Sequence, residues 1–169
     1  MLDFLTPDRM FGKYDDITPG FLAAEGKRAI VADIDNTLAP YEQPDPDERF
    51  RKWLTAMQEA GIGVALVSNN EAERVERFNR DLGLPAYSKC GKPSPKYILA
   101  ALSDLGVEPS DAVFLGDQIF TDVAAAKRAG MTALIVPPIK DKKTLFFRFK
   151  RLCEKPVIRR YRRLHGDEK

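Results

Sequence analysis

Five short apolar runs alternate with segments that carry apolar residues at helical spacing, and this order constrains the fold more than any other feature. The runs cover residues 29–32, 62–67, 86–89, 112–115 and 132–136. After the first run, for example, Phe50, Trp53, Leu54 and Met57 recur at the period of an amphipathic helix. Strands that alternate with helices form parallel sheets covered on both faces. The sequence therefore predicts an α/β fold with a doubly wound, Rossmann-like parallel sheet.

Composition limits the chemistry that the chain can perform. Its 169 residues, 44% hydrophobic and 31% charged, are typical of one soluble globular domain. Cys90 and Cys153 are too few and too far apart for a disulfide framework, which fits a reducing cytoplasm. The only histidine, His165, lies near the C-terminal end and leaves no Ser–His–Asp or Cys–His site in the body. We expect a cytoplasmic protein, without a signal peptide or membrane span, whose reactive groups are carboxylates.

The charge is distributed unevenly along the chain. Residues 140–163 contain eleven lysines or arginines and two acidic residues, whereas the remainder contains 16 basic and 23 acidic residues. We therefore divide the chain into a domain of residues 1–139 and a basic tail of residues 140–169. An acidic body with a basic tail predicts an anionic partner for the tail.

Apolar residues accompany the basic ones in this tail, and they suggest which anion it meets. An amphipathic helix that carries Phe146, Phe147 and Phe149 among basic residues predicts peripheral contact with anionic lipid headgroups at the inner membrane face. The alternative is a helix that packs on the body and leaves its charges in solvent. Pro156 is expected to end the helix. Nucleic acid is disfavoured, because no nucleic-acid module accompanies the charge.

Polar residues follow four of the apolar runs, where the predicted strands end. Asp33 and Asp35 follow the first run; the later runs are followed by Ser68 and Asn69, by Lys92, and by Gly116, Asp117 and Asp122. Each alone could be an ordinary turn, helix cap or solvated side chain. The carboxyl ends of parallel strands share one edge, however, and this is where α/β folds bind ligands. Carboxylates, a hydroxyl and an ammonium together predict a phosphoryl-transfer site with bound Mg²⁺.

These four motifs resemble those of the haloacid dehalogenase superfamily of phosphatases, over about residues 20–137. The stretches IVADIDNTL, VSNN, GKP and GDQIFTD are similar to its YqeG-type subgroup, which is related to phosphatidylglycerophosphate phosphatases. Members often insert a cap domain after the first motif or between the second and third. Neither interval of this chain is long enough for one, so we expect a capless core.

The resemblance implies a role for each motif residue. Asp33 is the expected nucleophile, which forms an aspartyl-phosphate, and Asp35 is the expected general acid and base. Thr37 supports the geometry of the loop. The phosphoryl group is expected to contact Ser68, Asn69 and Lys92. The expected ligands of Mg²⁺ are Asp33, the backbone carbonyl of Asp35 and Asp117, with Asp122 completing the shell through water or orienting Lys92.

The substrate is less constrained than the chemistry. A capless site is open to solvent and favours a large substrate that covers the pocket, such as a lipid headgroup. With the subgroup resemblance and the basic tail, this makes phosphatidylglycerophosphate the leading candidate. A protein, nucleotide or sugar phosphate is the alternative within the same chemistry. A non-catalytic, receiver-like scaffold that binds Mg²⁺ or phosphate is the alternative outside it.

In the loop after the apolar run 62–67, Asn70 and Glu73 are expected to cap the next helix reciprocally.

Overall fold

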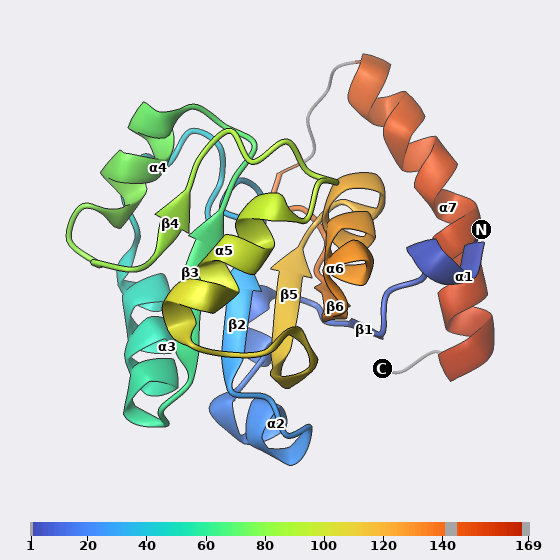
Figure 1. Cartoon of the computed structure of the whole chain (residues 1–169). Coiled ribbons are helices and arrows are strands. Elements are labelled where there is room, and N and C mark those ends of the chain that lie inside the picture. The colour runs from blue at the N-terminus through green and yellow to red at the C-terminus, as the bar shows by residue number, and fades with distance from the viewer. Residues whose placement is uncertain (1, 141–144, 167–169) are drawn as a thin grey trace.

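Six parallel strands form one sheet with helices on both faces (Figure 1). The computed structural model describes residues 2–140 and 145–166, apart from the side chains of residues 2 and 145–151. In the order of the sheet, the strands are β1 (Arg9–Met10), β6 (Thr132–Ile135), β5 (Ala112–Gly116), β2 (Ala29–Ala32), β3 (Gly63–Val67) and β4 (Ala86–Tyr87). The predicted doubly wound α/β fold is confirmed.

Among the described residues, four helices occupy the intervals between the predicted strands and one lies in the basic tail, as expected, whereas the two helices before the first predicted strand had no prediction. The helices are α1 (Leu2–Leu5), α2 (Pro19–Ala24), α3 (Glu48–Glu59), α4 (Ala72–Asn79), α5 (Lys96–Leu105), α6 (Ala124–Ala129) and α7 (Leu145–His165). A short π-helical turn, Ile119–Val123, precedes α6, and two 3₁₀ turns occupy Tyr14–Asp16 and Pro109–Asp111. Residues 35–92 are all described and fold into α3, β3, α4 and β4 with their connecting loops, which confirms the capless core.

Each central strand divides its side chains between two hydrophobic cores. In β2, Ile30 and Ala32 pack with α3 and α4, whereas Ala29 and Val31 pack with α5 and α6. This division follows from the alternation of side chains along a strand. A sheet buried on both faces explains why the strands are almost wholly apolar, and why polar side chains are concentrated where the strands end.

The N-terminal segment contributes an edge strand that the apolar runs did not predict. Arg9 and Met10 of β1 pair with Leu134 and Ile135 of β6. A strand of two residues, one of them charged, is too short to show an alternating or apolar pattern. Only the tertiary structure therefore reveals β1. The following residues pack on the core through Ile17 and Leu22, both fully buried. Residues 9–24 are thus part of the folded body.

The C-terminal helix α7 lies beside α1 and α6 (Figure 1) and continues through Pro156. The prediction that Pro156 ends the helix is therefore wrong. Pro156 lies on the exposed face, where water can bond a carbonyl that loses its helical partner, while Val157 and Tyr161 are buried against the body. The predicted boundary between residues 139 and 140 stays a prediction. The side chains of residues 145–151, which carry the aromatic part of the membrane prediction, lie outside the described residues.

No helix in the part of the chain that the structure describes is long and apolar enough to span a bilayer.

Candidate active site

The loop after β2 brings two carboxylates to the edge where the strands end. The carbonyl of Ile34 accepts hydrogen bonds from the amides of residues 37–39, which folds the chain into a tight turn. Asn36 takes a φ of 64°, a left-handed conformation that asparagine tolerates better than most residues. As a result, Asp33 and Asp35 line the same cavity.

Lys92 lies between two carboxylates at the centre of the site. Its Nζ donates to Asp33 Oδ1 at 2.7 Å and to Asp122 Oδ1 at 2.8 Å, and no side chain of the three is more than 8% exposed. Burial alone would lower the pKa of the Lys92 ammonium, but the charges of Asp122 and Asp33 outweigh it and raise the pKa above its ordinary value. Burial also raises the pKa of the Asp33 carboxyl to about 7, against the opposing charge of Lys92. The single ammonium of Lys92 thus forms ion pairs with two buried carboxylates.

Asp122 also holds the loop that follows β5. Its Oδ2 accepts hydrogen bonds from the amides of Asp117 at 3.1 Å and Gln118 at 3.0 Å. A Cβ on Gly116 would lie 2.4 Å from the Asp122 side chain, so glycine is needed where the strand meets this carboxylate. Of the two roles predicted for Asp122, the structure shows the contact with Lys92. A contribution to a metal shell through water stays a prediction.

Three carboxylates form a buried cluster beside Lys92. Asp33, Asp117 and Asp122 each offer an oxygen, and these atoms lie within 4.8 Å of one another. Closely spaced oxygen donors suit a hard divalent cation such as Mg²⁺. The donor set therefore fits the predicted metal, and a bound cation would offset the excess negative charge of the cluster.

Asp35 is held from the opposite side, by residues that follow β3. Asn70 Nδ2 donates to Asp35 Oδ2 at 3.1 Å, and the Ser68 hydroxyl lies 3.5 Å from the same oxygen. Ser68 Oγ also accepts from the Asn70 amide at 3.0 Å. The expected reciprocal cap between Asn70 and Glu73 is not formed, because the Asn70 side chain is bonded to Asp35 and to the amide of Glu71.

Arg74 is a site residue that the sequence did not single out. Its Nε donates to Asp35 Oδ1 at 3.1 Å, and its Nη1 donates to the carbonyl of Pro44 at 2.9 Å. The two charged side chains are only 12% and 14% exposed. Arg74 therefore joins Asp35 to the segment that follows the first motif. It lies at an ordinary polar position of a helix whose apolar residues are Val75 and Phe78, so the spacing carried no signal of this role.

Asn69 and Thr37 support their neighbours. The Asn69 side chain accepts from the Lys92 amide at 2.7 Å and donates to the Lys92 carbonyl at 3.2 Å. Thr37 Oγ1 donates to Asp33 Oδ2 at 3.3 Å. The Asn69 bonds hold the Lys92 backbone, and the Thr37 bond holds the Asp33 carboxylate. The predicted role of Thr37 in the geometry of the loop stays a prediction. The predicted contact of Asn69 with a phosphoryl group stays a prediction.

The cavity at this edge has a volume of about 220 Å³. Besides residues predicted from the motifs, its lining includes Tyr41, Gln118 and Thr121. Tyr41 comes from the segment after the first motif and is 46% exposed, so it stands at the mouth of the site. All eight predicted site residues therefore lie together. Seven line the cavity or belong to the acidic cluster, and Thr37 is bonded to Asp33.

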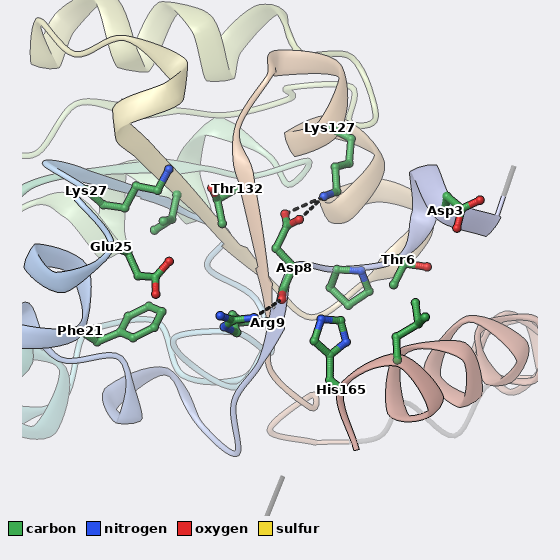
Figure 2. Close-up of a pocket in the computed structure, with 13 residues that line it drawn as sticks. Asp3, Thr6, Asp8, Arg9, Phe21, Glu25, Lys27, Lys127, Thr132 and His165 are labelled. Atoms are coloured by element: carbon green, nitrogen blue, oxygen red, sulfur yellow. Dashed lines mark hydrogen bonds and ion pairs between the residues drawn. The ribbon is translucent and has the colours of Figure 1, made fainter. Parts of the chain in front are cut away.

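A larger cavity of about 430 Å³ lies at the opposite edge, where the strands begin (Figure 2). Asp8 projects into it and binds Lys127 Nζ through both oxygens at 2.6 Å, while its Oδ2 accepts from the Ala133 amide at 2.7 Å. His165 also lines this cavity, and its ring stacks on Tyr161 with centroids 4.3 Å apart. His165 therefore lines a different cavity from the motif residues.

A family model for haloacid dehalogenase-like hydrolases matches residues 10–130, which include every motif residue described above. The chain belongs to this family. The matched residues include all three members of the buried acidic cluster.

Named relatives span different parts of this hydrolase. A Bacillus subtilis protein named "Probable phosphatase YqeG" is 34% identical over 155 residues, which cover 92% of this chain and 90% of the relative. A "Glyceraldehyde 3-phosphate phosphatase" of Methanopyrus kandleri is 30% identical over 128 residues, which cover 70% of this chain and 52% of that protein. The chain therefore matches nearly the whole of the first relative and about half of the second.

Solved structures support the fold. The cobalt-bound deoxy-D-mannose-octulosonate 8-phosphate phosphatase of Haemophilus influenzae is 14% identical, with a TM-score of 0.54 over 81% of this chain and 90% of that one. An uncharacterized Listeria monocytogenes protein is 18% identical, with a TM-score of 0.53 over 69% of this chain and 84% of that one. At these identities the likeness concerns the fold alone.

Proposed function

We propose that this hydrolase is a Mg²⁺-dependent phosphomonoesterase that acts through a phosphorylated Asp33, with phosphatidylglycerophosphate as its leading substrate. The observation that carries the chemistry is the placement of Lys92 between Asp33 and Asp122, with Asp117 in the same buried cluster. A phosphoryl group carries concentrated negative charge, so its transfer requires a nucleophile together with fixed cations.

In the first step, a carboxylate oxygen of Asp33 attacks phosphorus and forms a new P–O bond. The bond between phosphorus and the substrate alcohol breaks, and Asp35 donates its carboxyl proton to the leaving oxygen. Thr37 and Lys92 orient Asp33 through its two oxygens. Ser68, which lines the same cavity, donates its hydroxyl to a phosphoryl oxygen.

In the second step, Asp35 accepts a proton from water, and the water oxygen attacks phosphorus. The bond to Asp33 breaks and inorganic phosphate leaves. Arg74 and Asn70 hold both oxygens of Asp35, so the carboxylate is oriented before each proton transfer. Such splitting of one difficult displacement into two is the advantage of covalent catalysis.

Asp33, Asp117 and Asp122 would hold Mg²⁺, the last directly or through water. When bound, this cation supplies positive charge that neutralises the phosphoryl oxygens.

Two features favour a lipid substrate. The site has no cap domain to enclose a small molecule. In addition, the first turns of α7 lie toward the edge at which the strands end (Figure 1). Those turns carry three phenylalanines and three basic residues in the sequence. We propose that they contact an anionic membrane while the headgroup enters the site.

A small phosphorylated metabolite is the second candidate. The observation that favours it is the 30% identity to the Methanopyrus kandleri protein whose name gives a triose phosphate as substrate. The two candidates share one chemistry and differ only in what surrounds the phosphate.

Phosphate release from phosphatidylglycerophosphate in mixed micelles, with Mg²⁺ or with EDTA, tests the proposal. Mg²⁺-dependent release by the wild type and its loss in Asp33→Asn are the expected results. Activity on glyceraldehyde 3-phosphate and an aryl phosphate, without activity on the lipid, would reject the lipid and keep the phosphatase. Turnover of any of these by Asp33→Asn at the wild-type rate would reject the mechanism.

A further inference from the structure

The helix α7 contacts the body through one face. Glu154, Val157 and Tyr161 are 1%, 1% and 4% exposed, at positions three and four residues apart. The neighbouring Lys155 and Arg159 are exposed. Such spacing is that of a helix docked along a single stripe. A glutamate in that stripe is unusual, because a buried carboxylate loses its hydration and needs strong hydrogen bonds in return.

Glu154 forms such a bond in the loop that follows β5. Its Oε1 accepts from the amide of Ile119 at 3.1 Å. Ile119 is the first residue of the π-helical turn that leads into α6, and amides at the start of a helix have no partner within the helix. A carboxylate is the favoured acceptor there, since it also meets the positive end of the helix dipole.

The bond completes an array that contains the acidic cluster. Three successive amides, those of residues 117, 118 and 119, are bonded by two carboxylates. Asp122 accepts from the first two, and Glu154 accepts from the third. The second oxygen of Asp122 binds Lys92, which in turn binds Asp33. An unbroken chain of hydrogen bonds and backbone thus runs from the C-terminal helix to the proposed nucleophile.

We propose that Glu154 is a positioning residue of the active site: it fixes the loop that carries Asp117 and Asp122, and so makes metal binding depend on the docking of α7. The inference rests on the proposed function for its catalytic meaning. Removing Glu154 would leave the buried Ile119 amide without its acceptor and let residues 117–122 shift. The spacing of the three carboxylates would then no longer be held, and Lys92 would lose its orientation.

The other end of α7 supplies a matched control. Tyr161 OH accepts from the amide of Met10 at 3.1 Å, and the Tyr161 ring stacks on His165, which lines the cavity shown in Figure 2. Glu154 and Tyr161 both lie on α7, and each accepts one hydrogen bond from a backbone amide of the body. Of the two, only Glu154 contacts the loop that carries Asp117 and Asp122. Tyr161→Phe removes a bond of the same kind at the edge strand β1, outside residues 117–123.

The test compares Glu154→Ala, Glu154→Gln and Tyr161→Phe in the full chain. Amide hydrogen exchange reports on residues 117–123, calorimetric titration with Mg²⁺ reports on metal affinity, and an aryl phosphate reports on kcat. Glu154→Ala should exchange about 10- to 100-fold faster at residues 117–123, as expected for loss of a hydrogen bond to a charged acceptor. Its Mg²⁺ affinity and kcat should fall by about 10- to 100-fold.

Glu154→Gln keeps a carbonyl oxygen at the same reach and should recover most of each loss. Tyr161→Phe should exchange faster around Met10 while its Mg²⁺ affinity and kcat stay near those of the wild type. Wild-type exchange at residues 117–123 in Glu154→Ala would overturn the proposal. Faster exchange there with unchanged Mg²⁺ affinity and kcat would overturn it as well.

If Glu154→Ala does not fold, Glu154→Asp takes its place. The aspartate keeps the charge but is one methylene too short to reach Ile119, so it should show the same losses, and wild-type values would overturn the proposal. If the wild type neither binds Mg²⁺ nor hydrolyses any phosphomonoester, the proposed function fails. Hydrogen exchange then still decides whether Glu154 holds the loop.

Discussion

Each edge of the sheet contains a lysine bonded to aspartate, but the two edges differ in how the charges balance. Where the strands end, one lysine, Lys92, serves Asp33 and Asp122, and all three side chains are nearly inaccessible. Where they begin, Lys127 serves Asp8 alone, with side chains 21% and 40% exposed. The charge of Asp8 is balanced by Lys127, and Asp8 accepts a further hydrogen bond from the Ala133 amide.

The difference separates a reactive ion cluster from a structural ion pair. Asp8 ties β6 to α6 through Ala133 and Lys127, and it faces the larger of the two cavities. The smaller cavity is lined by buried carboxylates whose excess negative charge a bound cation would balance. Under the proposed function, the chemistry lies in the smaller cavity, so unbalanced buried charge is a better guide to the site than cavity size.

The largest effect is expected from parallel substitutions of the two aspartates. Asp33→Asn removes the nucleophile and should reduce turnover of an aryl phosphate by at least about 1,000-fold. Asp8→Asn keeps an acceptor for Ala133 and loses only a partly exposed ion pair, so its turnover should stay near the wild-type value. A comparable loss of turnover in Asp8→Asn would remove the distinction between the edges.

A smaller effect is expected from two arginines one turn apart on α4. Arg74 binds buried Asp35, whereas Arg77 pairs with Asp45 at the surface, with side chains 49% and 56% exposed. Arg74→Ala should lower kcat by about 10- to 100-fold, because it removes a charged hydrogen bond that orients the acid and base. Arg77→Ala is the control and should change kcat little. Equal rates for the two variants would show that Arg74 has no positioning role.

The smallest effect concerns stability without metal. Burial raises the pKa of Asp33 to about 7 in the folded protein, above its value in the unfolded chain. The stability that the neutral carboxyl confers is complete below the unfolded pKa and is lost as the pH rises through about 7. Asp33→Asn cannot ionise, so in EDTA its Tm should exceed that of the wild type by more at pH 8 than at pH 5. Each kcal/mol would shift Tm by about 2–4 °C.

Differential scanning calorimetry at the two pH values measures this difference. Excess Mg²⁺ should reduce or reverse it, because the cation stabilises the ionised wild-type carboxylate. A Tm difference that does not change with pH in EDTA would contradict the excess of buried negative charge at this edge.

The sequence predicted that the motif residues converge at one edge of the sheet, because its signals are local. A buried strand must be apolar, and the first polar residues after it must lie at its end, so Asp33, Ser68 and Lys92 could be placed together before any coordinates. The parallel order of the strands then brought these loops to one edge.

The missed residues act across the fold. Arg74 has the pattern of a solvated helix position, and β1 is too short to carry a strand pattern. Glu154 is the only acidic residue between positions 142 and 166, and this makes it stand out in the sequence. The sequence did not indicate which group it would contact. Pro156 suggested a helix end because its local preference is clear, and packing of Val157 and Tyr161 overrides that preference.

The sequence alone indicated five of the six strands, the family and the groups available for chemistry, since these depend on patterns within a few residues. Only the tertiary structure decided which charges pair, which remain in excess, and that the C-terminal helix reaches the catalytic loop through Glu154 and Ile119. Contacts between residues 35 positions apart depend on how helices dock on the sheet. Local spacing does not encode that geometry.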